Sequence, residues 1–306
     1  MKKYLFLCFA SCILAMAIDF EDGLSGNLSL GVGMRNVKSN LSTLTNEDFL
    51  SDYNAKNSSS AFIPFLGVEL YYGNFIQKDR IFIKNYNGRD ISGVILGYEK
   101  AYLENLSTSF ALVSSLRTKA YANVYQIGQR EKTDLSKYGF KISQTYENDF
   151  GILNASYLLS KNKYDKDSIM YSSLKREGYY HEFEINYKFT LLDLGLHYDH
   201  NNAKGKAQSY SRYGINLGIY LAFAQDYIFN PYLNLSKYKA QEDDPIFHQK
   251  QNGKIRKLNV KFIKNQFLGY DGLYSFVNYG TERKNSDISF YDEKYQFLLT
   301  GIGYKF

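Results

Sequence analysis

The sequence contains no tryptophan, three prolines and two cysteines among its 306 residues. Both cysteines, Cys8 and Cys12, lie in the first seventeen residues, so a chain that begins at Ile18 can form no disulfide bond. Beyond the N-terminal region there is no apolar run of about 18 residues, which excludes a membrane-spanning helix there. No basic segment is interleaved with aromatic residues, so the sequence gives no sign of a nucleic-acid partner.

The N-terminal seventeen residues have the pattern of a secretory signal peptide. Lys2 and Lys3 are followed by a short apolar run from 4 to 13 and by the small-x-small sequence 15–17, so we expect cleavage before Ile18. The expected domains are a signal peptide over 1–17 and a barrel domain over 18–306. Without Lys2 and Lys3, 35 Lys and Arg face 31 Asp and Glu, a net charge of +4. Acylation of Cys12 is an alternative, although Phe9 fits a lipoprotein signal poorly.

The rest of the chain consists of strand-length segments with alternating apolar and polar residues. The clearest one places six large apolar residues on one face: Tyr213, Ile215, Leu217, Ile219, Leu221 and Phe223. Aromatic residues make up 17 % of the chain, with 30 tyrosines and 22 phenylalanines, and they gather at strand ends as in the aromatic girdles of membrane barrels. The mean hydropathy of −0.39 is compatible with a barrel, because only every second residue meets lipid.

These patterns predict an all-β fold, a transmembrane up-and-down antiparallel β-barrel of about 14 strands. Short turns at 148–149, 190–191 and 225–226 alternate with long polar loops at 36–60, 161–175 and 241–252, as in outer-membrane barrels. The strand count is least certain from 79 to 130. The segment 108–130 fits one long strand or two short ones, and merging the two short strands before it gives the alternative count of 12. Pro64 in the segment 62–72 indicates a strand end, a bulge or an imperfect pair.

The C-terminal segment 295–306 resembles the C-terminal signal of Gram-negative outer-membrane barrels. Gly301, Tyr304 and Phe306 have the spacing of that signal, whereas Leu299 stands where a polar residue is expected. The resemblance implies export through a cleaved signal peptide, a bacterial outer-membrane location surrounded by lipid, and recognition of this strand by the barrel-assembly machinery. The alternative is a buried final strand in a soluble β-sandwich.

The inward faces of the predicted strands carry charges of both signs. We expect thirteen charged or titratable residues to line the lumen: Arg35, Glu69, Glu99, Lys141, Glu147, Glu182, Glu184, Lys188, Asp193, His197, Asp199, Lys257 and Lys261. They either line a water-filled path for small solutes or pair across it and block it. A barrel of about 14 strands is wide enough to be open, and the loop 36–60 is the candidate constriction.

No catalytic motif is clear, and we expect neither an enzyme nor a cofactor or metal. The segment 197–202 contains two histidines and an aspartate, which could serve a lipid hydrolase or a metal site. However, it lacks the Ser-Asn-Gly context that outer-membrane phospholipases carry after their histidine, and we place His200 in a loop. Glu182 and Glu184 are more readily explained as lumen wall than as an acid–base pair.

The first strand and the loop after it carry a family resemblance. Gly23-Leu24-Ser25-Gly26, residues 28–33 and residues 38–42 resemble the opening of a porin-like family of Gram-negative outer-membrane proteins catalogued as a domain of unknown function. The resemblance implies a barrel and supplies no binding residues. We therefore expect a monomeric, passive channel for small solutes, with a surface-binding or structural barrel as the alternative and a membrane hydrolase as the third hypothesis.

Overall fold

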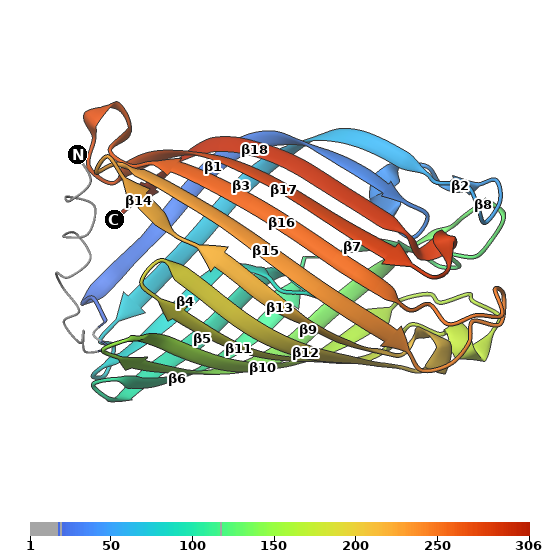
Figure 1. Ribbon diagram of the computed structural model, residues 1–306, viewed down its shortest axis with the longest axis horizontal. Coiled ribbons are helices and arrows are strands. Elements are labelled where there is room, and N and C mark those ends of the chain that lie inside the picture. Colours follow the sequence, from blue (N-terminus) through green and yellow to red (C-terminus); the bar gives the residue numbers. More distant parts are fainter. Residues whose placement is uncertain (1–17, 19, 117) are drawn as a thin grey trace, which may run out of the picture.

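The computed structural model describes residues 18, 20–116 and 118–306, so the expected signal peptide lies outside the described residues. Fourteen antiparallel strands form a closed barrel (Figure 1). The wall strands, in chain order, are β1 (Gly23–Ser39), β3 (Ser58–Gly73), β4 (Asp79–Asn87), β5 (Ser92–Leu103), β6 (Leu106–Ser115), β9 (Lys132–Asn148), β10 (Gly151–Tyr164), β11 (Gly178–Phe189), β12 (Leu192–Ala203), β13 (Tyr210–Ile219), β15 (Tyr227–Ala240), β16 (Gly253–Lys264), β17 (Leu273–Ser286) and β18 (Glu293–Lys305).

Four short strands and five 3-10 turns complete the fold. β7 (Thr118–Tyr121) extends the wall beside β9, β14 (Leu221–Phe223) continues β13 beside β15, and β2 (Phe49–Leu50) pairs with β8 (Gly128–Gln129). The 3-10 turns are η1 (Thr43–Thr45), η2 (Ser172–Leu174), η3 (Lys206–Gln208), η4 (Phe267–Gly269) and η5 (Ser289–Tyr291). Within the described residues, no helix is long and apolar enough to cross a membrane.

The barrel closes where the last strand pairs with the first. β18 is antiparallel to β1 from the pair Asn27 and Lys305 to the pair Ser39 and Glu293. Beyond it, the amide of Gly26 donates to the carbonyl of Phe306 at 2.8 Å, and the amide of Phe306 donates back at 3.1 Å. Closure leaves neither terminal strand with a free outer edge, which is how a sheet pairs its backbone groups without help from water.

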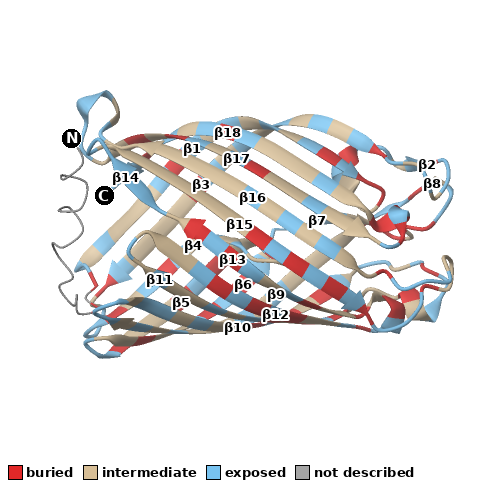
Figure 2. Cartoon of the chain, in the orientation of Figure 1, coloured by how far each residue is buried: buried red, intermediate tan, exposed pale blue. Residues whose placement is uncertain are grey.

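Burial alternates along many of the strands, as the period-two pattern predicts (Figure 2). On β13, the side chain of Ile215 is 50 % exposed and that of Leu217 36 % exposed, whereas Asn216 between them is 4 % exposed. The large apolar side chains therefore cover the outer surface and the polar ones face the interior. This arrangement is the inverse of a soluble core, and it excludes the β-sandwich alternative.

The two ends of the barrel differ in the length of their connections. Short turns lie at the end that holds the C-terminus, here called the turn end. The turns predicted at 148–149, 190–191 and 225–226 are found there at 149–150, 190–191 and 224–226. The opposite loop end holds the segments 40–57, 116–131, 165–177, 204–209, 241–252 and 287–292. The predicted alternation of short and long connections holds for most of the barrel, but the turn-end connection 265–272 is longer than the loop-end segments 204–209 and 287–292. Several strands run further than the sequence indicated: β1 continues to Ser39, and β17 continues to Ser286.

One local prediction needs correction, and one ambiguity of the sequence is resolved. His200 lies within β12, not in a loop, and faces outward beside Ser211 of β13. Over the segment 108–130, the two short strands β6 and β7 follow each other along the same neighbour, β9, and occupy one position in the wall, which accounts for the predicted count of 14.

The loops pack into a cap over the loop end. Its buried apolar residues come from five loop-end segments: Leu50, Tyr121, Val124, Tyr125, Ile169, Leu174, Ala207, Ile288, Phe290 and Tyr291. The guanidinium of Arg130, 2 % exposed, donates to the carbonyls of Asn40 and Glu47 and stacks on the ring of Tyr121 at 3.7 Å. The cap therefore has a core of its own.

Candidate functional site in the lumen

Along the hairpin of β4 and β5, β4 separates from its wall neighbour β3, and the hairpin turn reaches into the lumen. β5 pairs with β6 over its whole length, but β4 pairs with β3 only from Glu69 to Gly73. From Ser58 to Val68, the corresponding edge of β3 has no strand partner among the described residues. The hairpin turn spans 88–91 and is closed by a bond from the Gly88 amide to the Ile91 carbonyl at 2.8 Å. We call residues 79–103 the inner hairpin.

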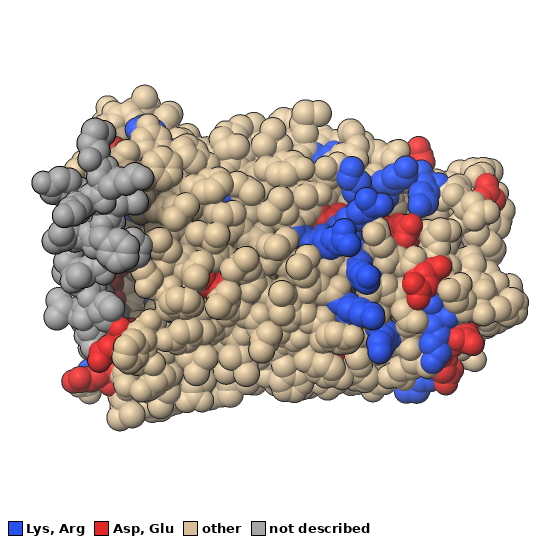
Figure 3. Space-filling view, in the orientation of Figure 1, with Lys and Arg blue, Asp and Glu red and all other residues tan. Residues whose placement is uncertain are grey.

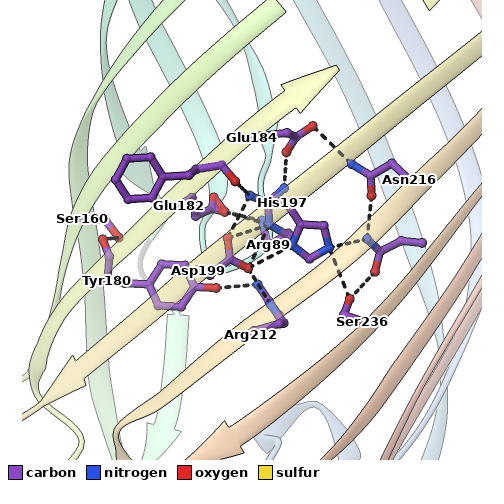
Figure 4. Close-up of polar contacts among 12 residues, drawn as sticks. Arg89, Ser160, Tyr180, Glu182, Glu184, His197, Asp199, Arg212, Asn216 and Ser236 are labelled. Carbon is purple, nitrogen blue, oxygen red and sulfur yellow. Dashed lines mark hydrogen bonds and ion pairs between the residues drawn. The ribbon is translucent and has the colours of Figure 1, made fainter. Parts of the chain in front are cut away.

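Arg89 at the tip of the inner hairpin reaches the far wall of the lumen (Figure 4). Its guanidinium donates to Asp199 on β12, with Nη2 and Oδ1 2.9 Å apart, and forms an ion pair with Glu184 on β11. Its backbone amide donates to the Glu182 carboxylate at 3.2 Å. β11 and β12 are separated from β4 by several strands in either direction around the sheet, so these contacts span the lumen.

Asp199 is the centre of this cluster, and its side chain is fully buried. It accepts a second guanidinium bond from Arg212 Nε on β13, at 2.6 Å, and lies 3.5 Å from His197 Nδ1. His197 Nε2 lies 2.9 Å from the amide of Asn234. The carboxylates of Glu182, Glu184 and Asp199 thus lie beside two guanidinium groups, as buried charges require.

Two further contacts fix the hairpin tip. The ammonium of Lys137 on β9 donates to the Asp90 carboxylate at 2.7 Å and to the Asp90 carbonyl at 2.9 Å. Ile91 is fully buried and belongs to an apolar cluster in the lumen that includes Val113 and Leu158. The tip is therefore held to the wall by ion pairs on two sides and by apolar packing.

The inner hairpin divides the lumen into separate cavities. A cavity of about 690 Å³ on the loop-end side is lined by Asp90, Lys137 and the cap residues Tyr125 and Tyr291. A second cavity of about 520 Å³ lies nearer the turn end and is lined by Arg89, Glu184 and Lys141. A third, of about 670 Å³, opens at the turn end beside Phe306. The hairpin tip, with Arg89 and Asp90, stands between the first two cavities.

Four of the predicted lumen residues meet in the Arg89 cluster: Glu182, Glu184, His197 and Asp199. The other nine are dispersed along the wall: Arg35, Glu69, Glu99, Lys141, Glu147, Lys188, Asp193, Lys257 and Lys261. Glu99 pairs with Arg80 within the inner hairpin at 2.7 Å, and the ammonium of Lys141 lies 5.3 Å from the ring centre of Tyr86. Contact of these residues with a passing solute stays a prediction.

Sequence reasoning missed Arg89, Asp90 and Arg212. Arg212 has the parity of the inward Gly214 and Asn216, so the alternation of β13 could have indicated it. Arg89 and Asp90 follow an Asn-Gly turn signal, and charged residues in a turn are usually solvated. Only the separation of β4 from β3 reveals their role. The lumen constriction is this hairpin. The expected constriction, 36–60, instead completes β1, begins β3 and packs its middle part, 40–57, into the cap.

The histidine-rich segment does not form a complete hydrolytic site. The lumen residues His197 and Asp199 are held in the Arg89 cluster, away from the outward His200. His200 Nδ1 lies 3.1 Å from Ser211 Oγ on the outer surface, but among the described residues no acidic or amide side chain is bonded to its other ring nitrogen. A nucleophilic serine needs such an orienting group behind its histidine. The described residues also contain no group of three or more metal-binding side chains.

The fold is that of outer-membrane channel barrels. A FadL homologue of Pseudomonas aeruginosa aligns with a TM-score of 0.55 and 11 % identity, over 95 % of this chain and 92 % of that one. The TodX monoaromatic hydrocarbon channel, as a deltaS2 mutant, aligns with a TM-score of 0.51 and 10 % identity, over 94 % and 90 %. A comparison with curated proteins finds no match.

Residues 23–305 match the model of the family described as "Protein of unknown function (DUF2860)". The chain belongs to this family.

Proposed function

We propose that the protein is an outer-membrane diffusion channel for small solutes, and that the inner hairpin occludes its lumen in the resting state. The proposal rests on the ion pairs that Arg89 makes across the lumen with Glu184 and Asp199. The barrel size, the polar interior and the apolar exterior support a channel in a lipid bilayer. The similarity to channel structures supports the same assignment through the fold.

The ion pairs of Arg89 determine how often the channel opens. Breaking a buried ion pair costs about 3–5 kcal/mol, so an open state with the hairpin displaced is a minor population, on the order of 1 % or less. Such a channel passes solutes in brief events. The mixed charges of the lumen give it weak selectivity for the sign of the solute charge.

Single-channel recording in planar bilayers tests the proposal with two matched variants. Arg89→Gln removes the ion pairs across the lumen, and we expect its open probability to rise at least tenfold over that of the unmodified protein. Arg80→Gln is the control, because Arg80 lies in the same hairpin but pairs with Glu99 of that hairpin. Equal open probabilities for all three proteins, or no conductance in any folded protein, would contradict the proposal.

The unpaired edge of β3 supports a second candidate function, lateral release of apolar solutes through the wall. The outward residues Phe62 and Leu66 are 67 % and 59 % exposed, so this edge lies at the height of the apolar belt. An unpaired strand edge inside hydrocarbon leaves backbone polar groups without partners unless the gap adjoins a water-filled cavity. Pro64, which lacks an amide hydrogen, is typical of such an edge. One of the structurally similar proteins, TodX, is a monoaromatic hydrocarbon channel.

An apolar lining residue distinguishes the lateral route from the axial one. Ile63 faces inward on the free edge of β3, and Ile263 packs on the same apolar cluster from β16, away from the gap. If solutes leave laterally, Ile63→Glu reduces toluene flux into vesicles severalfold and leaves the flux of a small sugar unchanged, whereas Ile263→Glu changes neither. Equal toluene flux in both variants would eliminate the lateral route.

A further inference from the structure

Several strands carry lysine or arginine on the outer surface at one common height. Figure 3 shows these cations as a band near the loop end of the barrel. They belong to five adjacent strands, and all are exposed: Lys38 on β1, Lys237 and Lys239 on β15, Lys254 and Arg256 on β16, Arg283 on β17 and Lys294 on β18. We call these residues the cation band.

The register of the strands places like charges directly opposite one another. Arg256 is paired with Arg283, Arg283 with Lys294, and Lys294 with Lys38, which gives an unbroken row across β16, β17, β18 and β1. Lys237 and Lys254 form a further opposed pair on β15 and β16. Like charges directly opposite on a sheet are destabilising, so binding of an external anion would reduce the repulsion within this row.

The protein itself supplies few partners for the band. Among the described residues, no ion pair joins any band residue to a carboxylate, and the one side-chain bond is from Arg283 Nε to the neutral Asn285 at 2.8 Å. By contrast, the inward Lys284, next to Arg283, lies 3.5 Å from the Glu293 carboxylate. The band is thus a surface of unneutralised charge, unlike the paired charges of the lumen.

The band begins where the apolar surface ends. On β1 the outward residues are apolar from Leu24 to Met34, and Lys38 follows on the same face. Ten residues at about 3.4 Å per residue, tilted by about 40°, span roughly 26 Å of membrane normal. This distance equals the height of the hydrocarbon-facing belt of outer-membrane barrels, about 25 Å. The cations therefore lie at the level of lipid headgroups on the side of the long loops.

We infer that the cation band binds the phosphate groups of a phosphorylated glycolipid in the outer leaflet. A row of closely spaced cations at headgroup level matches a lipid with more than one phosphate on its sugar headgroup, because each phosphate can accept bonds from two neighbouring strands. The inference rests on the proposed outer-membrane location and does not depend on channel activity. It gives the barrel a preferred side, formed by β15 to β18 and β1, for ordered lipid.

Binding of lipid A to the full-length protein tests this inference. The probe is fluorescent bisphosphorylated lipid A in phosphatidylcholine vesicles that contain the reconstituted protein, with dephosphorylated lipid A as the comparison. The triple variant Arg256→Gln, Arg283→Gln and Lys294→Gln removes the centre of the row. Lys163→Gln, Lys204→Gln and Lys250→Gln removes equal charge from exposed lysines elsewhere at the loop end.

We expect the band variant to bind bisphosphorylated lipid A on the order of a hundredfold more weakly, since each basic residue near an anionic surface contributes a factor of about five. The control variant and the unmodified protein should bind alike, and both should lose their preference when lipid A is dephosphorylated. Equal binding by the band and control variants would overturn the inference. If conductance is absent while the band effect persists, the channel proposal fails and the lipid site stands.

Discussion

At the residue scale, the carboxylate of Asp199 joins the inner hairpin to the barrel wall. It accepts bonds from Arg89 at 2.9 Å and from Arg212 at 2.6 Å, and no part of its side chain is exposed. Removing one partner of a buried ion pair leaves the other charge uncompensated. The same carboxylate therefore holds the inner hairpin and neutralises the wall behind it.

Asp199→Asn should lower the free energy of unfolding by about 3 kcal/mol, because two buried guanidinium groups lose their shared countercharge. The measurement is the urea unfolding midpoint in lipid vesicles, followed by tyrosine fluorescence. Glu177→Gln is the control, since Glu177 pairs with Lys204, which is 65 % exposed, and an exposed pair contributes less than about 1 kcal/mol. Equal midpoints for the two variants would contradict the central role given to Asp199.

At the element scale, the inner hairpin and the cap of loops close the lumen at two levels. The cap contains a hydrogen-bonded pair of buried tyrosines, with the hydroxyls of Tyr125 and Tyr291 2.6 Å apart, and Tyr291 donates to Asp244. Burial raises the pKa of Tyr125, and burial together with Tyr125 and Asp244 raises that of Tyr291. Both hydroxyls are therefore held in the neutral form.

The cap should loosen in alkaline solution. An unfolded cap ionises its tyrosines from about pH 10, whereas the folded cap keeps them neutral. Keeping these tyrosines neutral stabilises the folded cap relative to the unfolded cap. This contribution to the free energy of unfolding is fully present below about pH 10 and is lost as the pH rises toward the folded pKa values. Protease cleavage of the loops, measured from pH 8 to 11, should accelerate above pH 10. The double variant Tyr125→Phe and Tyr291→Phe should show a weaker dependence, and an identical dependence would refute this assignment.

At the scale of the whole molecule, the outward apolar belt determines where the barrel resides. Leu30, 63 % exposed in the middle of β1, should face lipid, so Leu30→Arg should destabilise the barrel by about 2–4 kcal/mol in vesicles. Asn36→Arg on the same face lies at the level of the cation band and should cost less than about 1 kcal/mol. Unfolding in detergent-free vesicles measures both, and equal costs would place the belt elsewhere.

The sequence predicts the barrel well because alternation is a local property of each strand. The outward Ile215 and inward Asn216 could be assigned from parity, and so could the turns and the approximate strand number. The course of the inner hairpin could not be predicted from the sequence, because parity does not show whether β4 stays beside β3. The cation band could not be predicted from the sequence either. Lys254 and Arg256 share one face of their strand by parity, but their pairing with Lys237 and Arg283 depends on the register between strands.

Recognition of Gly301, Tyr304 and Phe306 by assembly machinery stays a proposal. The strand that carries these residues, β18, closes the barrel by pairing with β1, which gives a physical reason for such recognition. Until β18 arrives, β1 presents a bare row of amide and carbonyl groups from Asn27 to Ser39. Exposed strand edges recruit other chains and start aggregates. A chain that ends before β18 would therefore leave one edge of β1 unpaired, and assembly of the barrel requires that this edge stay shielded until the last strand pairs with it.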